Sequence, residues 1–173
     1  MKSVLISIQP KWCEKIANDK KTIEVRKTAP KEVPFKAYIY CSYGKDKENY
    51  MLGKRGKVIG EFICDKVYLI KNQGNRFFVA DEEQSVTNEI ARQSCLDYND
   101  MVSYLGNKDG YGWYISDLKI YDKPRGLNEF TPFCKYKGDF CEACLHYVKA
   151  FGGCCKTLKR PPQSWQYVNE VEE

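Results

Sequence analysis

The sequence predicts an α+β fold, in which a small β-barrel or curled sheet has helices packed against it. Segments with strand character outnumber those with helix character, and the helices fall in two insertions between strands. The length of 173 residues, 43% of them hydrophobic, suffices for one domain with a sizeable core. We therefore expect a single domain over residues 1–173, with a cysteine-rich insertion at about 133–157.

The first half of the chain is expected to form three strands and one helix. The strand segments are rich in β-branched and aromatic residues, and Pro10 favours a helix start because its fixed φ suits the first turn. These strands are expected at 3–8, 21–27 and 35–42, and the helix at 11–17.

The second half begins with a long alternating run over 57–70, which predicts a bent central strand. Gly60 marks a bulge or a close approach within it. Two helices, an aromatic strand that stops at Pro124 and a short last strand follow. The helices are expected at 81–92 and 98–105, and the strands at 111–121 and 163–168.

The formal net charge of +5 permits an anionic partner without requiring one. Basic residues concentrate in 11–36, 119–125 and 156–160, whereas acidic residues gather in 81–89 and 170–173. The apolar run at the amino terminus is too short for a signal-peptide core, and no run is long enough to span a membrane. We expect a soluble cytoplasmic protein without a membrane partner.

The stretch NDKKTIEVRK, residues 18–27, combines a polar turn with a predicted strand. In a strand, Thr22, Glu24 and Arg26 share one face, while Ile23 and Val25 point to the other. Two interpretations stay open. The charged face is either solvated surface with cross-strand charge pairs, or it lines a cleft.

Nine cysteines, an odd number, do not suit a disulfide framework in a reducing compartment. Four lie scattered in apolar patterns and are expected to be buried thiols: Cys13, Cys41, Cys64 and Cys95. The other five crowd together near the carboxyl end: Cys134, Cys141, Cys144, Cys154 and Cys155.

The C-x-x-C spacing of Cys141 and Cys144 allows two thiolates to bind one zinc ion. Cys134, together with Cys154 or Cys155, would complete a tetrahedral structural site, and His146 is an alternative ligand. A loop of free thiols and a redox pair are the other interpretations.

The segment SIQPKWCEKIANDKKTIEVRK resembles the signature of ASCH domains, members of the PUA-like superfamily, in which a helix and a turn precede G-x-K-x-x-E-x-R. Lys21, Glu24 and Arg26 match this pattern, and Asp19 replaces its glycine. GKVIGEF resembles the family's central strand. GWYISDLKIYDKPRGLNEF and LKRPPQSW resemble a version found in phage and prophage genes. The resemblance covers most of the chain and implies a PUA-like barrel whose signature residues line a cleft for RNA or a modified nucleobase.

The signature residues suit such ligands chemically. Lys21 can reach a phosphate or a carbonyl oxygen, and Arg26 offers a planar fork for bidentate contact. Glu24 can hold the arginine, accept a hydrogen bond from a base amino group or act as a general base. Aromatic side chains are expected mostly in the core, with Trp12 and Trp165 the exceptions that stack on a base. Ser164, beside Trp165, could add a hydroxyl contact.

The resemblance also implies an enzymatic alternative. Small bacterial family members hydrolyse N4-acetylcytidine with a lysine, a threonine and a distant glutamate. Lys21 corresponds to the lysine, Glu24 occupies the threonine position, and Glu61 and Glu89 are candidates for the distant glutamate. Other members resemble ribonucleases, although a single histidine, His146, excludes a two-histidine mechanism.

Three hypotheses follow. The first is binding of RNA or a modified base through the cleft. The second is hydrolysis in the same cleft, with Lys21 and Glu24 as catalytic residues. The third is a phage-encoded adaptor that binds a host protein through the cysteine loop and the acidic tail.

Overall fold

The computed structural model describes residues 1–44, 50–74, 77–79, 89–133, 147–148, 153–154 and 157–170, and in them two main sheets, one two-stranded ladder and three α-helices. The larger sheet contains β1 (Lys2–Ile8), β3 (Phe35–Cys41), β4 (Lys57–Cys64), β8 (Ser116–Arg125), β9 (Phe130–Pro132) and β12 (Trp165–Glu170). The smaller sheet contains β2 (Ile23–Arg26), β5 (Val67–Asn72), β6 (Phe77–Val79) and β7 (Gly110–Tyr114). A separate ladder pairs β10 (Tyr147–Val148) with β11 (Gly153–Cys154).

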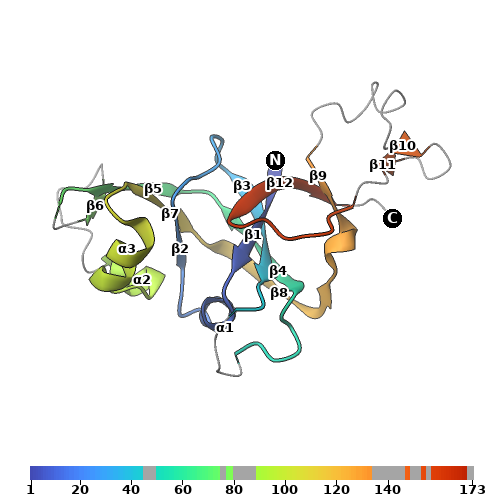
Figure 1. Ribbon diagram of the computed structural model, residues 1–173, viewed down its shortest axis with the longest axis horizontal. Coiled ribbons are helices and arrows are strands. Elements are labelled where there is room, and N and C mark those ends of the chain that lie inside the picture. Colours follow the sequence, from blue (N-terminus) through green and yellow to red (C-terminus); the bar gives the residue numbers. More distant parts are fainter. Residues whose placement is uncertain are drawn as a thin grey trace.

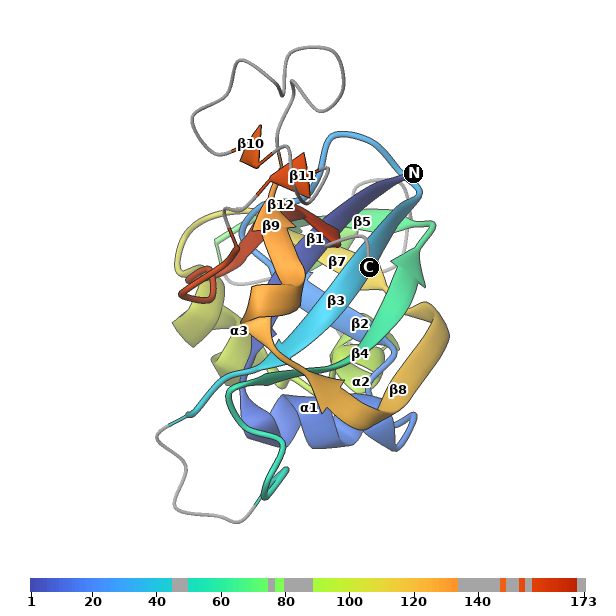
Figure 2. The same ribbon diagram turned by 90° about the vertical axis from the view of Figure 1, so that its right-hand side faces the viewer.

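The helices are α1 (Pro10–Ala17), α2 (Glu89–Ser94) and α3 (Tyr98–Leu105), and η1 (Leu127–Glu129) is a short 3-10 helix. The larger sheet has the order β8-β4-β3-β1-β12-β9, and the smaller one β2-β7-β5-β6. Every pairing among the strands that the structure describes is antiparallel except that of β1 with β3, which is parallel. Helix α1 connects β1 to β2 and lies below the larger sheet, while α2 and α3 lie beside the smaller one (Figures 1 and 2).

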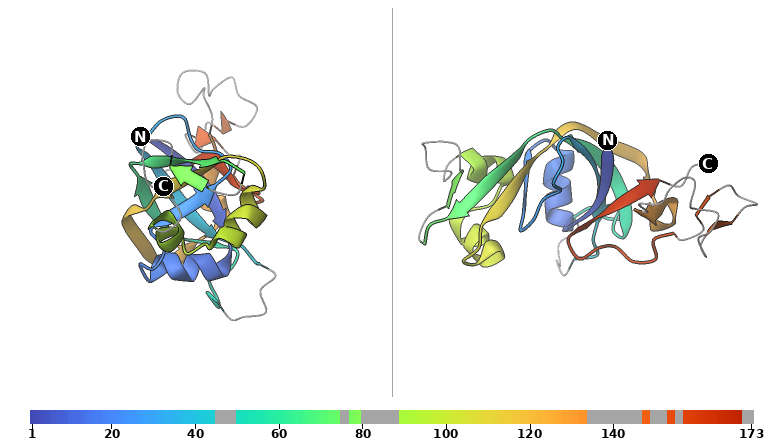
Figure 3. Two further views of the ribbon diagram at one scale, coloured as in Figure 1. Left: turned by 90° about the vertical axis from the view of Figure 1, so that its left-hand side faces the viewer. Right: turned by 90° about the horizontal axis from the view of Figure 1, so that it is seen from above.

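A bent two-stranded ribbon joins the two sheets (Figure 3). β4 continues into β5 after Asp65 and Lys66, and β7 continues into β8 after Ile115. β4 pairs with β8 in one sheet, and β5 pairs with β7 in the other. The expected single strand over 57–70 is therefore wrong, because the segment forms two strands in two sheets; the bend predicted within it is the point at which the ribbon changes sheets.

Two details of this ribbon concern residues singled out in the sequence. The register shifts on both sides of Gly60, and a Cβ there would meet the Lys119 carbonyl, which confirms the close approach. The expected stop at Pro124 is wrong, because β8 continues to Arg125. β8 is the edge strand of its sheet, where proline is tolerated because no ladder hydrogen bond is required of it.

Three apolar clusters fill the spaces between these layers. One packs α1 against the larger sheet and contains Cys13 and Ile16 of the helix together with strand residues such as Ile6. The second packs α2 and α3 against the smaller sheet through Ile23 and Val25. The third covers the opposite face of the larger sheet and contains Leu5, Tyr38, Tyr40, Val58, Phe130, Leu158 and Val168. β2 is consequently buried on both faces.

The helices begin where local chemistry favours it. Pro10 occupies the first turn of α1, and Asp97 caps α3 by accepting a hydrogen bond from the Asp100 backbone, 2.7 Å away. The helix predicted at 98–105 is confirmed. Of the helix predicted at 81–92, residues 81–88 lie outside the described part, and the described helix continues to Ser94.

The α+β class is confirmed. Among the described strands, β8 and β9 end the larger sheet and no pairing joins them, so the pairings describe curved sheets rather than a closed barrel. Most of the cysteine-rich insertion lies outside the described residues. No described helix is long and apolar enough to cross a membrane.

Candidate functional site

A cleft of about 590 Å³ opens between β2, the amino end of α1 and the chain just before β12. Its lining comes from segments that are far apart in the sequence: Ser7, Ile8, Gln9, Lys11 and Trp12, then Lys21, Glu24, Val25 and Arg26, then Ser42, then Leu96, Asp100, Ser103 and Tyr104, and finally residues 161–164. Pocket volumes of a few hundred Å³ suit small ligands such as a nucleoside.

The floor of this cleft is a buried ionic group made of Lys21, Glu24 and Arg26. Their exposed fractions are only 2%, 6% and 6%, respectively. Glu24 lies between the two cations, with Oε2 3.3 Å from Lys21 Nζ and Oε1 3.0 Å from Arg26 Nη2. The interpretation as a solvated charge pair is therefore wrong, and the charged face of β2 lines a cleft.

Backbone carbonyls hold the two cations in place. Lys21 Nζ donates to the Ser94 carbonyl at the end of α2, 2.6 Å away. Arg26 Nη2 donates to the Ser7 carbonyl in β1, also 2.6 Å away. The backbone just before β2 is held in the same way, since the Thr22 N–H donates to the Gln93 carbonyl at 2.9 Å. The ionic group is thus held in place by α2 on one side and by β1 on the other.

Burial also changes the proton affinities of the cleft. It lowers the pKa of Lys21, although the Glu24 carboxylate opposes this shift. Burial raises the pKa of the Tyr104 phenol, which the Arg26 guanidinium opposes. A lysine with a lowered pKa more readily supplies a neutral amine, which is the form required of a general base or a nucleophile.

Two buried polar atoms of this group make no hydrogen bond within the described part of the chain: Glu24 Oε2 and Arg26 Nε. Glu24 Oε2 is ion-paired with Lys21 but keeps acceptor capacity, and Arg26 Nε is a donor. Both atoms are covered by neighbouring groups, so a ligand reaches them only after a neighbour shifts. Buried polar atoms without hydrogen-bond partners are uncommon, and here one is a donor and the other an acceptor.

The rim near α1 is cationic and aromatic. Trp12 is half-buried and lines the cleft, and the ammonium groups of Lys11 and Lys21, which line it too, lie 4.5 and 5.2 Å from its ring centroid. The amino end of α1 also borders the cleft, and its N-cap residue, Gln9, makes no capping hydrogen bond with its side chain. A helix amino terminus attracts negative charge, so this rim favours an anionic ligand.

The structure brings together four of the five residues predicted to bind a base or nucleic acid. Lys21, Glu24, Arg26 and Trp12 all line the cleft. Trp165 does not line it. Its ring packs edge-on against Trp113 at 5.7 Å, and its Nε1 donates to Thr28 Oγ1 at 3.0 Å.

Ser164 lines the cleft, as the hydroxyl contact requires, whereas the two candidate distant glutamates do not. Glu61 accepts a hydrogen bond from Tyr121 at 2.5 Å and pairs with Lys36 at 3.4 Å. Glu89 is exposed on α2, where it pairs with an arginine one turn away. Neither carboxylate is in the cleft beside Lys21.

The scattered cysteines are buried as predicted, with one exception. Cys13, Cys41 and Cys64 are buried, and burial raises the pKa of Cys64 to about 12. Cys95 is only partly buried, because it lies in the turn after α2 with a φ of 54°.

The clustered cysteines fall outside the described residues, apart from the backbone of Cys154 in β11. Among the residues that the structure describes, no group of His, Cys, Asp and Glu side chains is arranged to hold a metal ion.

Several lining residues carry no signal in the sequence. Ser7 lies in β1, Gln9 just before α1 and Tyr104 in α3. Nothing in their local sequence distinguishes them from surface residues. The Pro161-Pro162 pair is the exception, since its rigidity marks a segment with a defined path. That segment is fixed where the Ser7 hydroxyl donates to the Pro162 carbonyl at 2.6 Å.

Solved structures of an ASCH protein from Zymomonas mobilis resemble this fold. One has a TM-score of 0.59 at 17% identity, covering 97% of this chain and 88% of that one. A mutant of that protein with tyrosine replaced by phenylalanine has a TM-score of 0.59 at 16% identity, covering 98% of this chain and 91% of that one. A second mutant, with serine replaced by alanine, has a TM-score of 0.56 at 17% identity, covering 97% of this chain and 89% of that one. No family model and no curated protein matches the sequence. The chain therefore has the fold of an ASCH domain.

The burial of the ionic group predicts that Glu24 is critical for stability. Glu24→Gln keeps the shape but leaves two buried cations without a counter-charge, which is expected to lower the free energy of unfolding by about 3–5 kcal/mol. Urea denaturation followed by circular dichroism measures this. Glu32→Gln, which breaks an exposed ion pair with Lys2, is the control and is expected to have little effect. Equal effects of the two substitutions would contradict the prediction.

The lowered pKa of Lys21 predicts a pH-dependent contribution to stability. Below the ordinary lysine value of 10.5, the unfolded chain binds a proton at this side chain more tightly than the folded chain does. The unfolding free energy of the wild type should therefore rise, relative to Lys21→Met, as the pH rises towards 10.5. Urea unfolding over this range tests it, with Lys108→Met at an exposed position as the control. If the difference in unfolding free energy between the wild type and Lys21→Met stays constant with pH, the lowered pKa of Lys21 is refuted.

Proposed function

We propose that this chain is an ASCH-domain protein, of the type found in phages and prophages, whose cleft binds an unpaired or modified nucleobase of single-stranded RNA. The observation that carries the proposal is the buried group of Lys21, Glu24 and Arg26 on the floor of the cleft. The fold agrees with the resemblance in the signature segment. The phage type rests on the sequence segments around 112–130 and 158–165.

The chemistry of the cleft supports a nucleobase. A base edge presents a hydrogen-bond donor beside an acceptor, for example the amino group and ring nitrogen of cytosine. Glu24 offers the complementary acceptor, and Arg26 the complementary donor. Leu96, Tyr104 and the proline pair add apolar surface for the faces of the base. A solvent-shielded donor and acceptor discriminate strongly, because a ligand that fails to pair with them leaves them unsatisfied.

The charge of the cleft supports a ligand with phosphates. Lys11, Lys21 and Arg26 contribute three cations to the lining, against the carboxylates of Glu24 and Asp100. Lysine and arginine bind phosphate oxygens, and such binding releases counterions and weakens with salt. Trp12 at the rim supplies a ring on which a neighbouring base can stack.

Hydrolysis in the same cleft is the second candidate, and the buried Lys21 favours it. Its lowered pKa suits a general base, and Glu24, 3.3 Å from its ammonium, can exchange a proton with it. The substrate would be an acylated nucleoside such as N4-acetylcytidine, or RNA itself. The third hypothesis, a host-protein adaptor, concerns segments that the structure does not describe.

Binding of a labelled, mixed-sequence single-stranded RNA, followed by fluorescence anisotropy across a salt series, tests the first candidate. We expect affinity to fall as salt rises, and Lys21→Ala to weaken binding by about tenfold or more. Trp12→Ala, at a half-buried rim position, should weaken binding by about 1–3 kcal/mol if a base stacks there. Lys108→Ala should change little.

Circular dichroism of each variant establishes that the fold is retained. Chromatography of the same RNA samples, and of N4-acetylcytidine, after incubation detects any product and so distinguishes turnover from binding. Absence of RNA binding by the wild type would rule out the polymer and leave free nucleosides or a protein as the ligand.

Structural zinc at the clustered cysteines is a separate proposal, which rests on the C-x-x-C spacing of Cys141 and Cys144. We expect the purified protein to contain about one zinc ion per chain, and chelation to destabilise it, because a structural metal contributes its binding free energy to folding. Metal analysis and thermal denaturation with and without chelator measure both effects. Cys141→Ser should lower zinc content, whereas Cys64→Ser should not. Full stability after complete zinc removal would refute the role.

A further inference from the structure

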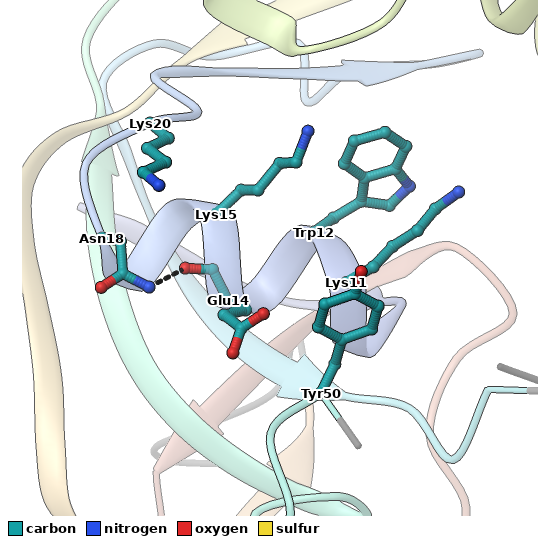
Figure 4. Close-up of a pocket in the computed structure, with 7 residues that line it drawn as sticks. All are labelled: Lys11, Trp12, Glu14, Lys15, Asn18, Lys20 and Tyr50. Atoms are coloured by element: carbon teal, nitrogen blue, oxygen red, sulfur yellow. Dashed lines mark hydrogen bonds between the residues drawn. The ribbon is translucent and has the colours of Figure 1, made fainter. Parts of the chain in front are cut away.

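A second cavity, of about 350 Å³, lies on the outer side of α1 (Figure 4). Lys15 and Lys20 line it on one side and Tyr50 on another. Lys11 and Trp12 line both this outer cavity and the cleft, so they form a wall common to the two. A ligand that extends from the cleft across Trp12 would enter the outer cavity.

The outer cavity is strongly cationic. Lys11, Lys15 and Lys20 contribute three ammonium groups, against the single carboxylate of Glu14. Within the described part of the chain, no carboxylate forms an ion pair with any of these lysines. Their charge is therefore available to an external anion.

Trp12 holds two of these lysines in place. Figure 4 shows Lys11 and Lys15 on either side of its ring, and their ammonium groups lie 4.5 and 5.2 Å from the centroid. Lys21 approaches the same ring from the cleft, at 5.2 Å. An exposed cation–π contact is worth only about 0.5–1 kcal/mol, so a phosphate can recruit these groups at little cost.

We propose that the outer cavity binds the phosphate and ribose of the nucleotide adjacent to the one whose base enters the cleft. The RNA strand crosses the wall formed by Lys11 and Trp12, and Lys15 and Lys20 contact its phosphate. This inference rests on the proposed function and narrows its ligand to an oligonucleotide rather than a free nucleoside. The shared wall favours one continuous strand over a separate acidic protein partner.

Competition against the labelled RNA tests this inference, with mixed-sequence ribodinucleotides and the corresponding nucleoside monophosphates as unlabelled competitors. In the wild type, we expect the dinucleotides to compete at about tenfold lower concentration than the monophosphates do. The double substitution Lys15→Gln and Lys20→Gln should reduce this advantage to about threefold or less, without changing competition by the monophosphates. It should also make the slope of log affinity for RNA against log salt concentration shallower, by the equivalent of about one to two phosphate contacts.

The control is a matched pair at exposed positions that line neither cavity, Lys108→Gln and Lys123→Gln, which should keep the full dinucleotide advantage. If both double substitutions reduce the dinucleotide advantage equally, the effect is one of general charge and the inference is overturned. An unchanged advantage in the Lys15 and Lys20 variant would overturn it as well. Displacement of RNA by polyglutamate as strongly as by RNA of equal charge would overturn it in favour of an acidic protein.

The outcomes also separate this inference from the proposed function. One outcome is that monophosphates compete and Lys21→Ala weakens RNA binding, but dinucleotides compete no better than monophosphates. In that case the cleft binds a base, and only the outer subsite is refuted. If monophosphates do not compete and Lys21→Ala has no effect, the proposed function fails, and this inference fails with it.

Discussion

The carboxylate of Glu24 is shared by two buried cations, and much of the arrangement around the cleft depends on that contact. Lys21 extends from it to α2, and Arg26 extends from it to β1. β2 belongs to the smaller sheet and β1 to the larger one. The ionic group therefore links the two sheets at a point where no strand pairing joins β1 to β2 among the described residues.

Stability alone does not explain why charged side chains occupy this position. Removing three ionic groups from water is costly, and well-packed apolar residues of similar volume commonly give equal or greater stability than a buried ion pair. The ionic group lines a cleft, and its contacts leave one acceptor and one donor unsatisfied. We interpret the group as a preorganised binding floor, whose side chains lose little conformational freedom when a ligand binds.

Helix α1 relates the floor of the cleft to the outer surface. Its inward face carries Cys13 and Ile16 into the core, which fixes its position against the larger sheet. Trp12, next in sequence to a buried residue, is thereby placed at the edge between the cleft and the outer cavity. Of the three lysines around its ring, Lys15 lies one helical turn after it, Lys11 is its sequence neighbour and Lys21 follows the turn after the helix. One short helix thus supplies core packing and a cationic rim.

The sequence by itself determined most of the local elements. Alternation and proline placement predicted β1, α1 and α3 within a residue or two, because these patterns act over a few neighbouring residues. The same reasoning placed Glu24 and Arg26 on one face of a strand. It did not decide whether that face is solvated, because the covering groups come from residues 161–164 and from α2 and α3, far away in the sequence.

Only the tertiary structure decided which residues meet. It split 57–70 between two sheets, placed Trp165 against Trp113 instead of in the cleft, and paired Glu61 with Tyr121 away from Lys21. Such outcomes depend on long-range packing, in which a side chain adopts the contact that the whole fold makes available. Periodicity determines the face of a strand or helix on which a residue lies, and the packing of the two sheets determines what that face contacts.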